Sequence, residues 1–213
     1  MRIVRIWIIL LGVGMGVMGC AGGPQLIPVT NPTQRLEFGD FSILPPHGEN
    51  WFITDPALLR RQVPDMLALF RKTLTPPSKS HTVTATVRSG RVPISAGSRA
   101  ELLQKLARIN FTQTGRHRPV SVNISPDKTL APDCVRYDGV TEDRGVPGYP
   151  GSIFIWDQHG FVCFHPDLSD SAIDIQYSQR RLQEEPPPLS LEAEGELFVK
   201  SLLFKKVPGR SSP

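Results

Sequence analysis

Short apolar runs broken by proline and glycine constrain the fold of this chain more than any other feature. In the run HTVTATV, residues 81–87, Val83, Ala85 and Val87 would face one side of a strand while the threonines face the other. This alternation is typical of a half-buried antiparallel strand. Further short runs occur at residues 36–44, 51–53, 67–74, 120–124, 134–140 and 173–177. The pattern predicts a protein built mainly from antiparallel strands.

Two apolar tetrapeptides flank the polar segment 157–160, which reads Asp-Gln-His-Gly. Because a short polar segment with glycine between two strands is the usual sign of a tight turn, residues 153–164 predict a β-hairpin with a four-residue connection.

The stretch 98–112 has the strongest helical pattern in the chain. Ser98 and Glu101 match a capping box, in which both side chains satisfy free N–H groups at the helix start. Leu102 and Leu106 follow at a spacing of four residues and would lie on one face. We expect a surface helix here.

A second helix is predicted over residues 190–204. Glu192 and Glu194 lie near its positive end, and Lys200 lies toward its negative end, which suits the helix dipole. Adjacent strands with only two principal helices indicate an α+β fold, since alternating βαβ units are lacking. We expect one α+β domain over residues 36–206, followed by a loose tail at 207–213.

The N-terminus has the layout of a secretory signal. Arg2 and Arg5 precede an apolar run from Ile6 to Val17, which is short for a transmembrane helix. The following Val17-Met18-Gly19-Cys20 resembles the lipobox of bacterial lipoproteins. An uncleaved N-terminal anchor, or an ordinary signal peptide with a chance cysteine, is the alternative.

The lipobox resemblance implies cleavage of residues 1–19 and attachment of diacylglycerol to the Cys20 thiol, with an acyl chain such as palmitate on the new amine. In bacterial lipoproteins, an aspartate directly after the lipidated cysteine retains the protein at the inner membrane. Since Ala21 occupies this position, the resemblance implies the outer membrane, facing the periplasm. Residues 20–35 contain three prolines and little periodicity, so we expect a lipidated N-terminus and flexible tether.

Cleavage would leave two cysteines, Cys134 and Cys163. In an oxidising periplasm, an even number of remaining cysteines favours a disulfide. Two buried thiols that never meet are the alternative.

The charge balance argues against a nucleic-acid partner. Without Arg2 and Arg5, Lys and Arg together fall from 24 to 22, against 20 Asp and Glu, and no dense basic cluster occurs.

Four segments together are similar to a group of uncharacterised bacterial lipoproteins, some with a PsbP-like α/β/α sandwich. The segments are FSILPPHGENW, CVRYDGVTEDRG, GFVCFHPD and EAEGELFVKSLLF, at 41–51, 134–145, 160–167 and 192–204. The resemblance implies a sandwich fold and an envelope location, but it supplies no catalytic residues.

The Gly- and Pro-rich segment 138–151 is the surface that the sequence favours as a binding loop, since rigidly supported loops commonly carry binding residues. Its candidate residues are Asp138, Glu142, Asp143, Arg144 and Tyr149.

Metal and catalytic motifs are weak. Asp157, His159, His165 and Asp167 are close in sequence, yet their spacing matches no zinc or two-histidine pattern, so we expect no metal and no cofactor. No Gly-x-Ser-x-Gly elbow occurs.

The sequence therefore favours a non-enzymatic binding or accessory module of the bacterial envelope. The alternatives are an envelope hydrolase or metal-dependent enzyme whose site forms only in three dimensions, and a structural lipoprotein that contacts peptidoglycan.

Overall fold

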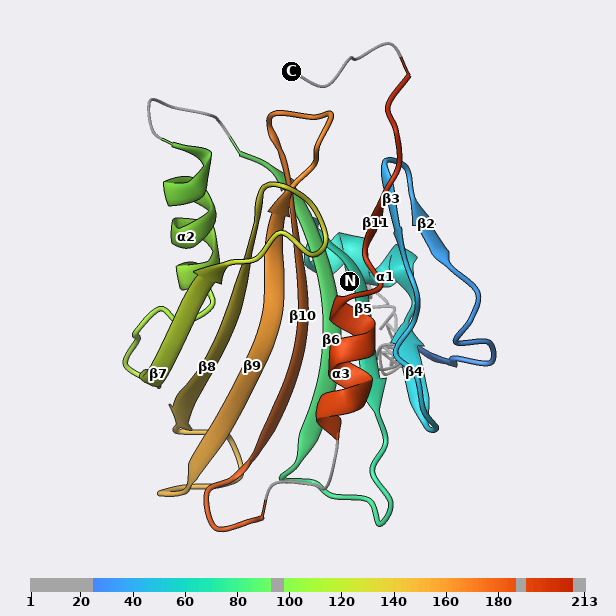
Figure 1. Cartoon of the computed structure of the whole chain (residues 1–213). Coiled ribbons are helices and arrows are strands. Elements are labelled where there is room, and N and C mark those ends of the chain that lie inside the picture. Colours follow the sequence, from blue (N-terminus) through green and yellow to red (C-terminus); the bar gives the residue numbers. More distant parts are fainter. Residues whose placement is uncertain (1–24, 93–97, 187–190, 209–213) are drawn as a thin grey trace, which may run out of the picture.

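The computed structural model describes residues 25–92, 98–186 and 191–208. An antiparallel sheet of eight strands dominates it, accompanied by a small sheet of three strands and by three helices in the described ranges (Figure 1). The expected α+β class is confirmed, with more strand than helix. Cys20, the signal segment and the start of the expected tether lie outside the described residues.

The large sheet has the strand order β1-β4-β5-β6-β10-β9-β8-β7, and the small sheet has the order β11-β3-β2. The strands of the large sheet are β1 (Leu26–Pro28), β4 (Trp51–Thr54), β5 (Met66–Lys72), β6 (Thr82–Arg91), β7 (His117–Pro126), β8 (Cys134–Arg144), β9 (Ile153–Phe164) and β10 (Ser171–Leu182). The small sheet contains β2 (Leu36–Phe38), β3 (Phe41–Ile43) and β11 (Leu203–Phe204). The helices are α1 (Pro56–Gln62), α2 (Arg99–Ile109) and α3 (Leu191–Val199).

β9 is one continuous strand, so the predicted hairpin at 153–164 is wrong. The strand pairs along its length with β8 on one side and β10 on the other. Its polar residues can stay in the sheet because their side chains have partners. His159 Nδ1 lies 2.9 Å from Asp138 Oδ1, and Gln158 Oε1 accepts a 2.9 Å hydrogen bond from Gln176 Nε2.

α2 begins where the capping pattern predicts. Ser98 Oγ accepts a hydrogen bond from the Glu101 N–H at 3.2 Å, and the helix ends at Ile109, three residues before the expected end at 112. α1 was not predicted. Asp55 caps it by accepting from the Ala57 N–H, and proline occupies its first turn.

α3 ends at Val199, so the helix expected over 190–204 is too long. The chain turns after α3 because Leu203 and Phe204 pair with Ser42 and Phe41 of β3. Strand pairing with a segment far away in sequence therefore overrides the helical pattern.

Both ends of the expected domain also need correction. Residues 26–28 form β1, in which Ile27 lies opposite Ile53 of β4, so paired structure begins before Leu36 and within the segment expected to be a flexible tether. At the other end, the N–H of Val207 donates to Asp167 Oδ2 at 3.0 Å, so the chain is still attached where the loose tail was expected to start.

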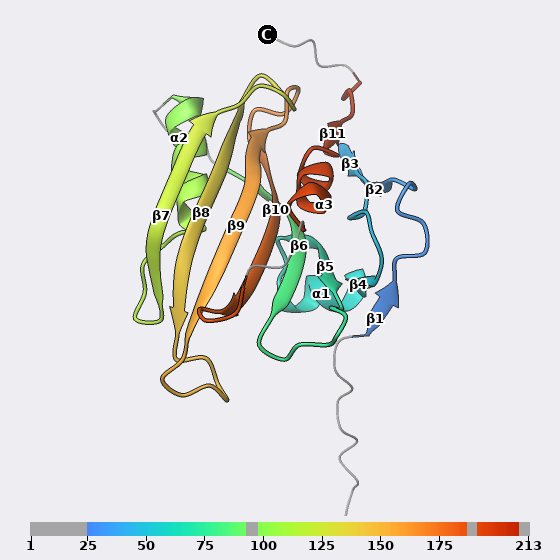
Figure 2. The ribbon, with the colours of Figure 1, turned by 60° about the horizontal axis from the view of Figure 1, so that its bottom comes forward.

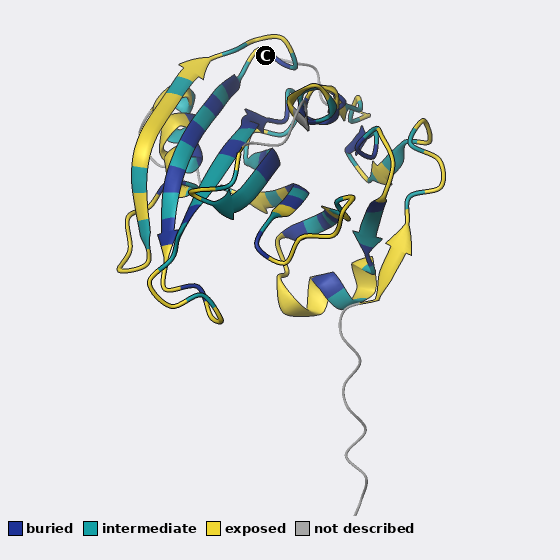
Figure 3. Cartoon of the chain, turned by 90° about the horizontal axis from the view of Figure 1, so that it is seen from below, coloured by how far each residue is buried: buried dark blue, intermediate teal, exposed yellow. Residues whose placement is uncertain are grey.

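The two faces of the large sheet carry different helices. α3 and the small sheet lie inside the curve of the large sheet, whereas α2 lies outside it (Figures 2 and 3). The core on the α3 side includes Phe70, Ile175 and Phe198, and the core on the α2 side includes Leu103 and Tyr137. Alternate residues of β9 and β10 contribute to the two cores, so each strand is packed on both faces.

Cys134 and Cys163 lie opposite each other on β8 and β9, within the core on the α3 side. Their Cα atoms are 4.1 Å apart and the sulfur atoms are joined at 2.09 Å. The expected disulfide is confirmed.

α2 packs mainly over β7, β8 and β9. The same face of the sheet continues over β10 and β6, and this continuation forms the floor of the candidate site. Among the described helices, none has both the length and the apolar character needed to cross a membrane.

Candidate functional site

A polar groove runs over the α2 side of the sheet, along β6, β10 and β9. Thr82, Thr84, Thr86 and Arg88 face this side because the intervening Val83, Ala85 and Val87 belong to the opposite core. The alternation predicted for this strand is therefore confirmed, and its threonine side forms part of the groove.

The groove consists of four adjoining pockets of about 400, 280, 270 and 250 Å³. The first two share Thr84 and Arg180, the second and third share His117 and Trp156, and the last two share Asn110. Shared lining residues make the pockets one continuous depression rather than separate sites.

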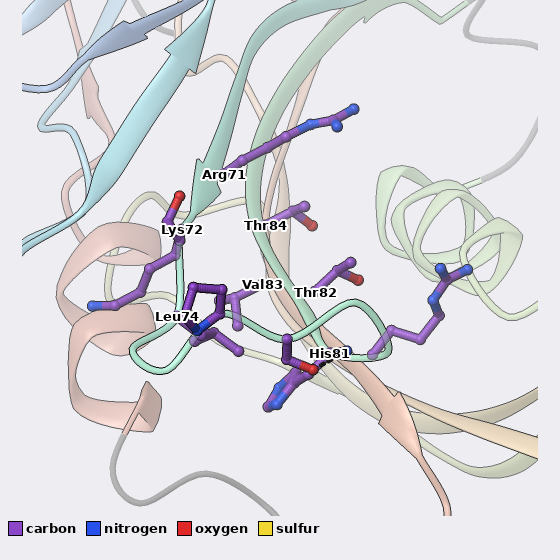
Figure 4. A pocket seen from close by; sticks show the side chains of 11 residues that line it. Arg71, Lys72, Leu74, His81, Thr82, Val83 and Thr84 are labelled. Carbon is purple, nitrogen blue, oxygen red and sulfur yellow. Dashed lines mark hydrogen bonds between the residues drawn. The ribbon is translucent and has the colours of Figure 1, made fainter.

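The largest pocket lies at the end of the β5–β6 connection (Figure 4). Arg71, Thr82 and Thr84 point toward the side of the sheet that carries α2, whereas Lys72 points toward α3. Lys72 Nζ contacts both carboxylate oxygens of Glu194 at 2.8 and 2.6 Å. Lys72 therefore anchors α3, whereas the side chains of Arg71 and Arg180 are the guanidinium groups that line this pocket.

A buried carboxylate, Asp143, organises the middle of the groove. It is 1% exposed, and its Oδ2 accepts from Nη2 of Arg116 and Nη1 of Arg180, both at 2.9 Å. His117 Nε2 lies 3.5 Å from its Oδ1. Burial by itself would raise the pKa of Asp143, but the two guanidinium groups outweigh it and hold the pKa below its ordinary value. The aspartate is thus a fixed negative charge that positions two arginines.

Hydroxyl and amide groups line the remaining floor. The Oγ atoms of Thr84 and Ser178 lie 2.9 Å apart, and the Nε2 of Gln158 donates to the carbonyl of Asn110 at 3.4 Å. Thr141 Oγ1 is buried at the floor without a hydrogen-bond partner among the described residues. A floor of this kind offers donors and acceptors to a polar ligand.

The end of the groove nearest α2 contains Asp174. Tyr137 Oη donates to its Oδ1 at 2.7 Å and Asn110 Nδ2 donates to its Oδ2 at 3.2 Å. Burial raises the pKa of Asp174 above its ordinary value even though these hydrogen bonds lower it. Leu106 and Val162 supply apolar lining beside it.

The segment 138–151, predicted to be a binding loop, is a loop only in its second half. Asp138, Glu142, Asp143 and Arg144 belong to β8, which extends to Arg144. Since side chains of a strand alternate between faces, Asp143 faces the groove while its two neighbours face the opposite side. Only Glu142 and Arg144 of this set are joined by an ion pair in the described ranges.

The other predicted loop residues have partners of their own. Glu142 binds Arg118, and it also contacts Arg144 at 2.7 Å. Tyr149, in the β8–β9 loop, packs edge-on against Phe154 with ring centroids 5.1 Å apart. These contacts hold the end of the sheet and leave the groove as the better candidate.

The histidine and aspartate residues considered as metal ligands do not converge. His165 is fully buried, with Nε2 3.1 Å from the carbonyl of Asp40 and Nδ1 accepting from the Asp167 N–H at 3.0 Å. Within the described ranges, no three His, Cys, Asp or Glu side chains are placed together as a metal site. His165 therefore fixes the turn after β9.

Sequence reasoning missed most of the groove, including Arg116, Ser178 and Arg180. The alternation of β6 was a usable signal, because it placed three threonines on one face. The pairing of β6 with β10, which sets Thr84 opposite Ser178, joins positions separated by 94 residues. No local pattern indicates that pairing.

Comparison of the chain with protein-family models and with curated proteins finds no match.

Proposed function

We propose that this protein is a lipid-anchored, non-enzymatic binding module of the bacterial envelope, held at the periplasmic face of the outer membrane. The observation that carries the proposal is the groove between Arg71 and Asp174. It is open, and along β6, β10 and β9 it is lined by strand residues, whose side chains are held in fixed relative positions.

The anchor would hold the folded domain close to the membrane. Five residues separate Cys20 from the start of β1 at Leu26. Even fully extended, they reach only about 20 Å, at roughly 3.5 Å per residue. Anchoring at this distance raises the effective concentration near other membrane-bound components, so that modest affinity suffices.

The ion pairs that the carboxylate of Asp143 makes within the groove favour a binding role over catalytic turnover. Asp143 is held as an anion between Arg116 and Arg180, which suits a structural role. The alternative, an envelope hydrolase, would rely on Asp174, whose raised pKa is the property expected of a general acid. Replacement of Asp174 by Asn tests the alternative, because a hydrolase that uses Asp174 as its general acid should lose turnover of envelope substrates.

Site-specific photo-crosslinking in intact cells tests the role of the groove. A photoreactive phenylalanine at Thr82, which is exposed and lines two of the pockets, should capture an envelope component. The matched control is Lys105, an exposed position on α2 outside the pocket linings. A Thr82→Trp substitution should remove the crosslink formed from a second groove position, Thr114. Equal capture at Thr82 and Lys105 would exclude the groove as the binding surface.

Fractionation tests the anchor. Cys20→Ala should abolish fatty-acid labelling and release the processed protein from the membrane. A variant that is still cleaved and still firmly bound to the membrane would contradict lipid anchoring through Cys20.

We further propose that the fold is a PsbP-like α/β/α sandwich. The support is the placement of α2 and α3 on opposite faces of one antiparallel sheet (Figure 3). An experimental structure of the protein whose sheet and two helices fail to superpose on such a domain in the same strand order would disprove the assignment.

A further inference from the structure

The middle of the groove has an excess of positive charge. Arg116 and Arg180 share the single carboxylate of Asp143, and the guanidinium group of Arg71 has no hydrogen bond or ion pair among the described residues. In the described part of the chain, Asp143 is the only acidic side chain that lines the two largest pockets. Because planar guanidinium groups bind carboxylate and phosphate through paired hydrogen bonds, this region is suited to an anion.

An aromatic surface lies beside these cations. Trp156 is partly exposed, lines two pockets, and lies opposite Arg180 on β10 and Thr141 on β8. The ring of His117 lies 5.7 Å from the indole at a tilted angle. The apolar face of a sugar ring packs on an indole, while the rim of the same ring carries hydroxyl groups that need polar partners.

Polar groups that can meet those hydroxyls surround the indole. Thr84 and Ser178 present a hydroxyl pair on one side. On the β8 side, Thr141 Oγ1 lacks a hydrogen-bond partner in the described ranges although Thr141 is 2% exposed. On the β10 side, Arg180 Nε is also buried without a partner in those ranges. Thr141 and Arg180 both line the pockets beside Trp156, so the hydroxyl groups of a sugar ring would find donors and acceptors on both sides of the indole.

The size of the groove indicates an extended ligand. The two pockets that share Trp156 have volumes of about 280 and 270 Å³, near the lower limit of ordinary ligand sites, which is roughly 300 Å³. A ligand that uses both pockets and also reaches Arg71 must span more than one sugar ring.

We infer that the groove binds an acidic oligosaccharide, with its negative group between Arg180 and Arg71 and a sugar ring on Trp156. This inference rests on the proposed function, since it names the ligand class of the same groove. The shared chemistry is an anionic group beside a pyranose ring. In an envelope that group is either the carboxylate of a peptidoglycan sugar or the phosphate of a lipopolysaccharide sugar.

Calorimetry with three defined disaccharides tests the inference on the processed full-length protein in detergent. The probes are an N-acetylglucosamine–N-acetylmuramic acid disaccharide with a free carboxylate, a glucosamine disaccharide phosphate, and neutral chitobiose. We expect at least one acidic probe to bind ten-fold more tightly than chitobiose, and the stronger of the two identifies the source of the anion. Equal affinity for all three, or binding of none, would overturn the inference.

Variants locate the interaction. Arg71→Gln should lower the affinity for the acidic probe at least five-fold. It should leave the fold intact, because Arg71 is exposed and its side chain makes no ion pair in the described ranges. Trp156→Ala should lower the affinity for the acidic probe at least ten-fold. Arg91→Gln is the matched control, since its side chain is 90% exposed and lies at the end of β6, outside the pocket linings. Unchanged affinity in Arg71→Gln and Trp156→Ala would contradict the placement.

The outcomes separate this inference from the proposed function. If Thr82 still captures an envelope component in cells while no acidic disaccharide binds, the ligand class is wrong and the binding role stands. If neither Thr82 nor the disaccharides give a signal, the binding role of the groove fails as well.

Discussion

Tyr137 occupies the space directly beside Gly160, its neighbour across the β8–β9 pair. A Cβ atom at position 160 would lie 2.6 Å from Tyr137 Oη and closer still to the carbonyl oxygen of Ile175. The absence of a side chain at Gly160 thus lets the phenol cross β9 and donate its hydrogen bond to Asp174 on β10. One glycine therefore links the buried tyrosine to the acidic end of the groove.

Gly160→Ala should destabilise the protein by about 2–3 kcal/mol, because overpacking against backbone cannot be relieved by a side-chain rotation. The measurement is the free energy of unfolding from urea titration. Gly90→Ala is the control, since Gly90 also lies in a strand but a Cβ atom there would have nothing within 4 Å. Equal losses in the two variants would show that the contact with Tyr137 has no special effect.

Replacement of both Cys134 and Cys163 by Ala should lower the free energy of unfolding by about 3–4 kcal/mol, since the cross-link closes a loop of about 30 residues in the unfolded chain. Denaturation of the native protein with and without reductant should give the same loss. Two alkylatable thiols in native protein prepared from an oxidising compartment would contradict the disulfide.

Asp143→Asn should cost about 2 kcal/mol at pH 7, because it leaves Arg116 and Arg180 without their carboxylate. The pKa of Asp143 is lowered by folding, so its stabilisation is present above the ordinary value of 3.8 and is lost as the pH falls through the lower folded pKa. The difference between wild type and variant should therefore begin to shrink near pH 4. A difference that stays constant down to pH 2 would contradict the ion pairs.

Asp174→Asn should have the opposite effect on the pH dependence of stability from Asp143→Asn. Burial raises the folded pKa of Asp174, so the ionised form costs stability at neutral pH. As the pH falls through the folded pKa toward 3.8, the wild type should gain stability relative to the variant. We expect the variant to be at least as stable as wild type at pH 7, with the difference removed below pH 4. Thermal unfolding across this range measures it, and a variant that is less stable at pH 7 but not at pH 4 would contradict the prediction.

Glu194→Ala should release α3 from the sheet at a cost of about 1–3 kcal/mol, since its carboxylate accepts hydrogen bonds from Lys72 and from Trp51 Nε1, the latter at 3.0 Å. Glu192→Ala, at an exposed position in the first turn of the same helix, should change stability little. Hydrogen exchange of the α3 amides would report the loosening directly.

Several features follow from the sequence alone because their causes are local. The alternation of residues 82–87 required one face of β6 to be apolar and the other to carry threonines, and the structure has both. Ser98 and Glu101 marked the start of α2, where free N–H groups need a cap within three residues. The disulfide between Cys134 and Cys163 was also predicted, from the number of cysteines and not from a local pattern, and the structure has it.

Other features were decided only by the tertiary structure. The segment 157–160 has the composition of a turn, yet it continues β9 because Asp138 and Gln176, on the two neighbouring strands, supply partners for His159 and Gln158. A polar side chain can stay in a packed sheet when it has a hydrogen-bond partner. Here the partners are distant in sequence.

The groove depends in the same way on long-range pairing. β10 lies between β6 and β9, and this order brings Arg180 beside Trp156 and, across the sheet, onto the buried Asp143. The sequence placed Asp143 in a loop because glycines and a proline follow it closely. Only the assembled sheet determines which face each strand residue takes, since a register is fixed by the simultaneous burial of both cores and not by any one segment.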